Sequence, residues 1–264
     1  PIDAEGMSHM RPSLLPGLLT AAERNISRGE TYIQLGEVGT VFAPEEDKTR
    51  GVDHTEAQHI SALRLGTPPR TPHQKAKQPD AFTLKADALS LLEALGHDVS
   101  RVMVKPDAPA WFHPGRSGTL VVQGRDVGYF GELHPQVGAF AGIKQRACAY
   151  EINLRTLTGM KIKPRPFAMS AYQPVKRDFA FVLDADVPAE KLMTTVKKAE
   201  KNLLRDINLF DVYDGENLPD GKKSLALTVT LQADDRTLTE DEISTISENI
   251  IKAAQKQLKA EIRG

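Results

Sequence analysis

Several residue types and patterns are scarce in this sequence of 264 residues, and each shortage excludes a class of protein. A single cysteine, Cys148, cannot form a disulfide within the chain, which excludes a disulfide-stabilised scaffold and favours a reducing, cytoplasmic environment. Its apolar neighbours predict a buried, unreactive thiol. Runs of apolar residues stay well below the roughly 18 residues of a membrane-spanning helix, so we expect no membrane partner.

An excess of charge of one sign is also lacking. The chain has 34 Lys and Arg against 35 Asp and Glu, a net charge of -1. Such a balance ordinarily argues against a protein that binds nucleic acid. The sequence starts at Pro1, with neither an initiator methionine nor a basic and then apolar signal. We therefore expect no secretion and interpret the chain as part of a longer one.

The composition that is present is that of a globular protein, with 40% hydrophobic and 26% charged residues. The length predicts two domains. A stretch rich in proline and basic residues predicts a linker over residues 161–169, between domains at residues 1–160 and 170–264. The second domain holds 14 basic and 17 acidic residues, so neither domain is basic in bulk.

The first domain mixes helices and strands. Leucines at helical spacing predict helices over residues 14–26 and 82–95, each followed by glycine. Strand-like runs lie at residues 32–35, 38–42, 119–123, 127–130 and 147–152, and the proline-rich residues 64–80 read as an exposed loop. The sequence lacks the strand–helix–strand alternation with a phosphate-binding loop that is typical of a parallel sheet. These patterns predict an α+β fold with an antiparallel sheet.

The second domain has a clearer pattern. Strands are predicted at residues 177–183, 207–213, 225–231 and 261–263, with helices at 188–204 and 239–258. Thr239 followed by Glu242 is the signature of a capping box at the start of the last helix. The order βαββαβ predicts a ferredoxin-like unit, in which both helices cover one face of an antiparallel sheet.

Strand parity indicates which side chains lie on the other, open face, because successive residues of a strand point to opposite sides. If Phe210 and Val212 belong to the core, Asp211 and Tyr213 share the open face. The full set expected there is Ala180, Asp211, Tyr213 and Ser224. A flat base could stack on Tyr213, and an ionised Asp211 would accept hydrogen bonds from N–H groups such as those of guanine. From parity alone, this face could equally pack on another domain or face solvent.

Several strings of residues resemble one known family. Phe-Asp-Val-Tyr-Asp-Gly at 210–215, Gly-Lys-Lys-Ser-Leu-Ala at 221–226 and Asp-Arg-Thr-Leu-Thr-Glu-Asp-Glu at 235–242 resemble the ferredoxin-fold anticodon-binding domain of bacterial phenylalanyl-tRNA synthetase β subunits, as does Val-Lys-Arg-Asp at 175–178. In the first domain, residues 10–19, 35–39, 113–117 and 131–135 resemble the synthetase-like domain of the same subunits. The resemblance covers essentially the whole chain.

This resemblance implies a function that no single motif provides. The family's anticodon-contacting residues fall on Ala180, Asp211, Tyr213 and Ser224, and we add possible phosphate contacts at Lys176, Arg177, Lys222 and Lys223. The first domain would have the class II synthetase fold without catalytic residues and pack on a catalytic α subunit. Phenylalanine tRNA would be the other partner, in an assembly of two α and two β subunits. The whole synthetase would need ATP and magnesium, but the resemblance implies that this segment binds neither.

Other chemistry is weakly supported by the sequence. The chain lacks the arginine signatures of the class II ATP site. Its seven histidines do not follow metal-ligand spacing, so we expect no metal site. The alternative interpretation is an autonomous regulatory protein that binds a small molecule, as some ferredoxin-like domains do. It would show saturable metabolite binding without an α subunit.

Overall fold

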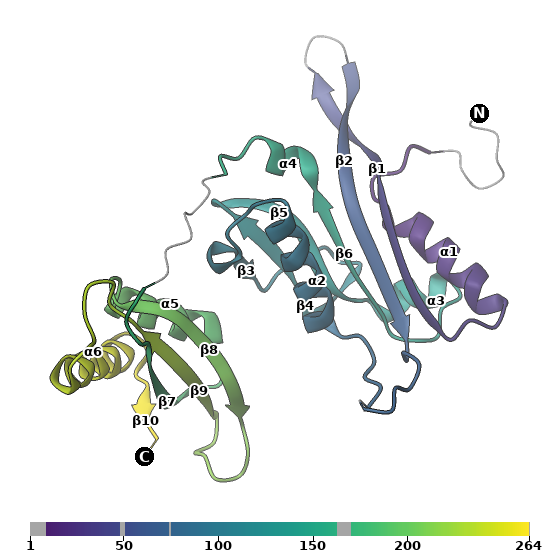
Figure 1. Cartoon of the computed structure of the whole chain (residues 1–264). Helices are drawn as coiled ribbons and strands as arrows, with labels where there is room; N and C mark the ends of the chain where they lie inside the picture. Colours follow the sequence, from purple (N-terminus) through teal and green to yellow (C-terminus); the bar gives the residue numbers. More distant parts are fainter. Residues whose placement is uncertain (1–8, 48–50, 74, 163–169, 264) are drawn as a thin grey trace. The chain divides into compact units, whose positions relative to one another are not determined.

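The computed structural model describes residues 9–47, 51–73, 75–162 and 170–263 (Figure 1). The chain divides into two compact units, Pro1–Pro164 and Arg165–Gly264, and each is described by itself. Most of the predicted linker, residues 163–169, lies outside the described residues. Within the described part of the chain, no helix is both long and apolar enough to cross a membrane.

A six-stranded antiparallel sheet forms the centre of the first unit, with strand order β1-β2-β6-β5-β4-β3. Its strands are β1 (Tyr32–Asp47), β2 (Gly51–Gly66), β3 (Met103–Lys105), β4 (Phe112–Val122), β5 (Arg125–Leu133) and β6 (Ala147–Asn153). Its helices are α1 (Leu15–Ser27), α2 (Ala81–Ala94), the short 3-10 helix η1 (Val99–Arg101), α3 (Pro135–Phe140) and α4 (Leu154–Thr158). The predicted α+β class with an antiparallel sheet is confirmed.

Helices α1 and α2 cover opposite faces of this sheet. The apolar side of α1 packs with Leu63 and Ala149, whereas that of α2 packs with Cys148 and Ile152. Cys148 and Ala149 are neighbours in β6, so their side chains point to opposite faces. Cys148 is fully buried, as predicted, and burial raises the pKa of its thiol to about 12.

The hairpin of β1 and β2 is longer than the sequence predicts. The apolar pattern indicates two short strands at residues 32–35 and 38–42, leaves 51–63 unassigned and places 64–66 in an exposed loop. Instead, β1 and β2 are both continuous, and the predicted loop is wrong at its start because Leu65 is a fully buried residue of β2. Gly36 and Glu37 separate the two predicted strands, but both residues are paired with β2, opposite Ala62 and Ser61. Gly39, within the second predicted strand, has a local role. A Cβ atom there would lie 2.3 Å from Nη2 of Arg11, whose guanidinium binds Glu37 at 2.6 Å. The glycine leaves room for this ion pair.

An ion-pair cluster joins two of the strings that carry the family resemblance. Nη1 of Arg116, on β4, lies 3.0 Å from both carboxylate oxygens of Glu132, on β5. Nε of Arg146 approaches the same carboxylate at 3.5 Å. Glu132 is buried, and a buried carboxylate requires such partners to remain ionised. Strings 113–117 and 131–135 therefore meet in one structural contact.

The second unit has the predicted ferredoxin-like order. It consists of β7 (Val175–Asp184), α5 (Ala189–Ala199), β8 (Leu204–Tyr213), β9 (Lys222–Leu231), α6 (Glu240–Leu258) and β10 (Glu261–Ile262). The antiparallel sheet has the order β10-β7-β9-β8, and α5 and α6 pack with its apolar side (Figure 1). The predicted helix over 188–204 is too long. It ends at Ala199 because the carboxylate of Glu200 binds the backbone N–H groups of Asn202 and Leu203, which turn the chain into β8.

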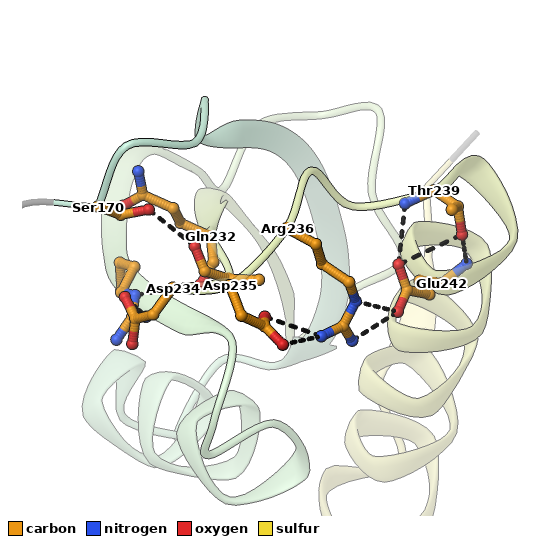
Figure 2. Close-up of polar contacts among 9 residues, drawn as sticks. Ser170, Gln232, Asp234, Asp235, Arg236, Thr239 and Glu242 are labelled. Carbon is orange, nitrogen blue, oxygen red and sulfur yellow. Dashed lines mark hydrogen bonds and ion pairs between the residues drawn. The ribbon is translucent and has the colours of Figure 1, made fainter.

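The string at residues 235–242 forms the start of α6 (Figure 2). Arg236 binds both Asp235 and Glu242, at 2.9 and 2.8 Å. Thr239 and Glu242 form the predicted capping box. The backbone hydrogen bond from Thr239, and then Arg236, lower the pKa of the Glu242 carboxyl group. Glu242 therefore serves the helix terminus, as the capping-box signature predicts.

Candidate functional site

The strand register defines the open face of the second sheet, on the side away from α5 and α6. Phe181 of β7 pairs with Leu225 of β9, and both are buried under the helices. The residues on either side of this pair point the other way. One row across β7, β9 and β8 is formed by Ala180, Ala226 and Asp211, and the next by Val182, Ser224 and Tyr213. The register thus brings all four sequence-predicted base contacts into two adjacent rows.

Asp211 and Tyr213 lie on this face for a structural reason that differs from the predicted one. The prediction assumes that Phe210 and Val212 are core residues, but these side chains are 54% and 56% exposed. A break in register between Leu209 and Asp211 leaves Phe210 without a partner on β9, which is the pattern of a β-bulge. The bulge resets the parity, so Asp211 faces Ala226 on the open side although Leu209 faces the core.

Asp211 lies on an uncrowded part of the face. Its row neighbours Ala180 and Ala226 have the smallest side chains that retain a Cβ. The carboxylate is exposed, and no side chain in the described part of the chain forms an ion pair or hydrogen bond with it. It is therefore available as a hydrogen-bond acceptor for a flat group that approaches over the alanines.

Tyr213 is held by the turn that follows β8. Nδ2 of Asn217 lies 3.5 Å from the phenolic oxygen. A Cβ on Gly215 would lie 2.4 Å from that oxygen and 2.5 Å from Cζ, closer than any real Cβ contact. Glycine in the string Phe-Asp-Val-Tyr-Asp-Gly thus makes room for the tyrosine ring.

Arg263 is a member of the site that the sequence reasoning missed. Its guanidinium carbon lies 5.3 Å from the centre of the Tyr213 ring, within the range of a cation–π contact. Its backbone N–H donates to the carbonyl of Ala180 at 2.8 Å. The pairing of Glu261 with Val182 places residue 263 on the same row as Ala180. The only signal in the sequence is the expected short strand at 261–263, whose register could not be read from so few residues.

The environment of Ser224 differs from the predicted one. This serine occupies the expected row between Val182 and Tyr213, but it is only 4% exposed. A ligand that is to reach its hydroxyl group has to displace a neighbouring side chain.

The four residues expected to contact phosphate do not converge. Arg177 points to the helix side and binds Glu240 at 3.1 Å, while Lys222 binds Asp184 at 2.7 Å. Hydrogen bonding to Asp184 raises the pKa of Lys222. Nζ of Lys223 donates to the carbonyl of Ala185 at 2.8 Å. Lys176 is exposed, four residues before Ala180 on β7, two rows from Asp211.

The open face as a whole carries more acidic than basic groups. Paired rows assign to it three basic residues, Lys176, Lys222 and Arg263, and five acidic residues, Asp178, Asp184, Asp206, Asp211 and Glu261. Within the described residues, no three His, Cys, Asp or Glu side chains gather into a potential metal site. Geometry and charge suit a neutral, flat group with N–H donors better than a phosphate-rich surface.

Comparisons with known proteins agree with these two units. Residues 1–154 match the model of the phenylalanyl tRNA synthetase beta chain CLM domain, and residues 170–263 match that of the ferredoxin-fold anticodon binding domain. The chain is 41% identical to the phenylalanine–tRNA ligase beta subunit of Paramagnetospirillum magneticum and 39% identical to that of Rhodospirillum rubrum. Each alignment covers 97% of this chain and 32% of the relative, so the chain spans about a third of their length. A solved pyrrolysyl tRNA synthetase from Desulfitobacterium hafniense has 20% identity and a TM-score of 0.41, over 56% of this chain and 48% of that one.

Proposed function

The chain belongs to the family of phenylalanyl-tRNA synthetase β chains, and from this premise we propose that its second unit binds the anticodon of phenylalanine tRNA. The observation that carries the proposal is the pair of rows that hold Asp211 and Tyr213 beside small side chains on an open sheet face. These are the residues on which the family's anticodon contacts fall.

Recognition is proposed to depend on stacking and on one charged acceptor. The first anticodon base of phenylalanine tRNA is guanine, whose N1 and N2 carry N–H donors. The ring of Tyr213 stacks on this base, an interaction worth about 1–3 kcal/mol, and the Asp211 carboxylate accepts from the N–H edge. Arg263 covers the Tyr213 ring in the free chain, so the base either replaces the guanidinium or enters between the two groups.

Phosphate attraction is proposed to be a minor contribution. Lys176 and Lys222 are the candidates on the open face, and Lys222 already pairs with Asp184. Lys223 pairs in register with Leu183 on the helix side of the sheet and donates to the carbonyl of Ala185. Arg177 contributes instead to the start of α6 through Glu240. The acidic excess of the open face further weakens any attraction for the RNA backbone.

The first unit is proposed to pack on a catalytic α subunit, in a cytoplasmic assembly of two α and two β subunits. ATP and magnesium are assigned to the α subunit. The support is the match of residues 1–154 to the β-chain model, together with the lack of catalytic arginine signatures in the sequence.

Titration of phenylalanine tRNA into the assembled synthetase tests the proposal. We expect Tyr213→Ala to weaken binding by about 5- to 150-fold, the equivalent of the 1–3 kcal/mol of one stacked base. Tyr213→Phe keeps the ring and serves as the matched control, with affinity close to wild type. Unchanged affinity in Tyr213→Ala would remove the stacking role.

A further inference from the structure

A pocket in the first unit contains polar groups that the proposed tRNA function does not use. It has a volume of about 270 Å³ and lies on the face of the sheet that α1 covers, between β2, β5, β6 and the residues before α1. Its walls include Ser13, His59, Trp111, Asp126, Tyr129 and Glu151. We propose that this pocket binds a small organic ammonium ion with a flat apolar body.

Glu151 is the charge that attracts such a ligand. Its buried carboxylate accepts hydrogen bonds from Oγ of Ser13 at 2.6 Å and from the backbone N–H of Leu14 at 3.3 Å. Nδ1 of His59 lies 2.6 Å from its other oxygen. The first two donors are neutral, and none of the described residues that line the pocket is Lys or Arg, so no permanent counter-charge contacts the carboxylate. A cation in the pocket supplies one.

His59 orients the ammonium group. An ionised carboxylate can only accept, so the tautomer that fits this contact has its proton on Nδ1, which faces Glu151. Nε2 then presents a lone pair to a donor. An ammonium group is a donor without a lone pair, whereas a carboxylate or phosphate would find only repulsion from Nε2 and from Glu151.

The remaining walls favour an aromatic or otherwise flat body. Trp111 and Tyr129 provide two aromatic side chains, and an ammonium group close to an aromatic face gains a cation–π attraction. The second acidic residue of the walls, Asp126, is neutralised by Lys105 at 2.6 Å. None of the described residues that line the pocket is Lys or Arg. The volume lies slightly below the usual 300–1,000 Å³ of ligand sites, which selects a monocyclic amine over a nucleotide.

The experiment uses three ligands that each carry a phenyl group on a short chain, with the 264-residue chain. 2-Phenylethylamine is the cation, 2-phenylethanol the neutral analogue and 3-phenylpropanoate the anion. Trp111 is the only tryptophan of the chain, so selective excitation of its fluorescence reports on this pocket. We expect saturable binding of the amine at least about tenfold tighter than that of the alcohol, and weaker binding still of the anion.

Two matched substitutions assign the effect to Glu151. Glu151→Gln removes the charge, and its amide N–H₂ can donate to Nδ1 of His59, which moves the ring proton to Nε2; we expect the preference for the amine to disappear. Glu132→Gln alters the other buried glutamate of the same sheet, which binds Arg116 and does not line this pocket, and should leave the preference intact. Equal binding of all three ligands, no saturable binding, or an unchanged preference in a folded Glu151→Gln variant would each overturn the proposal. If Glu151→Gln does not fold, the order of the three ligands on the wild-type chain decides.

Discussion

Gly215 offers a way to displace Tyr213 without altering it. The glycine has an ordinary backbone conformation, so alanine fits the chain at this position, and only its side chain meets an obstacle. The new Cβ would lie 2.4 Å from the phenolic oxygen of Tyr213 and 2.8 Å from Cε2. Because contacts this short do not occur, the tyrosine ring must leave its position on the open face.

The expected loss follows from the stacking energy. Displacement of the ring removes part or all of the stacking free energy of one base, which is ~1–3 kcal/mol. The tRNA affinity should therefore fall by up to about 150-fold. Stability should not fall with it, since Gly→Ala at a compatible position reduces the entropy of the unfolded chain and adds about 0.4–1 kcal/mol, less the strain of the displaced ring.

Gly221 provides the control at the other end of the same loop. Its φ angle is +74°, and no atom lies within 4 Å of the position that a Cβ would occupy. Gly221→Ala therefore strains the backbone by roughly 1–2 kcal/mol and leaves Tyr213 in place. Thermal unfolding and tRNA titration of both variants in the assembled synthetase separate the two effects. We expect Gly215→Ala to lose affinity at a nearly unchanged melting temperature, and Gly221→Ala to lose melting temperature at nearly unchanged affinity. Wild-type affinity in Gly215→Ala would refute the role assigned to the ring position.

Three further predictions concern charge, burial and capping. The anticodon interaction should depend weakly on salt, with a slope that corresponds to fewer than about six phosphate contacts; a steeper slope in a salt titration would contradict the minor role of phosphate. The pKa of Cys148 is about 12 in the folded chain against 9.0 for the free thiol, so the unfolded chain releases this proton first and stability should fall as pH rises from about 9 towards 12. Cys148→Ala should lessen that fall in thermal unfolding, and the wild-type thiol should react with an alkylating reagent at pH 8 only after unfolding. Thr239→Ala removes the capping box of α6 and should cost about 0.5–2 kcal/mol in chemical denaturation, whereas Thr245→Ala, in the exposed part of the same helix, should cost less.

Elements with strong local signals are predicted well from the sequence. Helix α6 has a capping box at Thr239 and apolar residues at helical spacing, and both its ends agree with the structure to within a residue. The hairpin between β4 and β5 turns at Gln123 and Gly124, both with positive φ, at the junction of the strands predicted at residues 119–123 and 127–130. In each case, neighbouring residues determine the conformation.

Features that depend on residues distant in the chain cannot be predicted from such local signals. The continuity of β1 across Gly36 and Glu37 comes from their pairing with Ala62 and Ser61 of β2, which the local sequence does not reveal. The prediction for Asp211 and Tyr213 reaches the correct face from a wrong premise, because the bulge at Phe210 compensates for the misplaced core residues. Arg263 joins the site only through the pairing of a two-residue strand.

The most direct test of the account is the dependence of base discrimination on Asp211. Phenylalanine tRNA with guanosine at the first anticodon position is compared with the same tRNA carrying inosine, which lacks the N2 amino group, on wild-type synthetase and on Asp211→Asn. A hydrogen bond to a charged group contributes about 1.5–3 kcal/mol, so wild type should bind the guanosine form at least about tenfold more tightly. We expect this preference to shrink markedly in Asp211→Asn. Equal discrimination by the two proteins would contradict the assignment of Asp211 as the acceptor that reads the base.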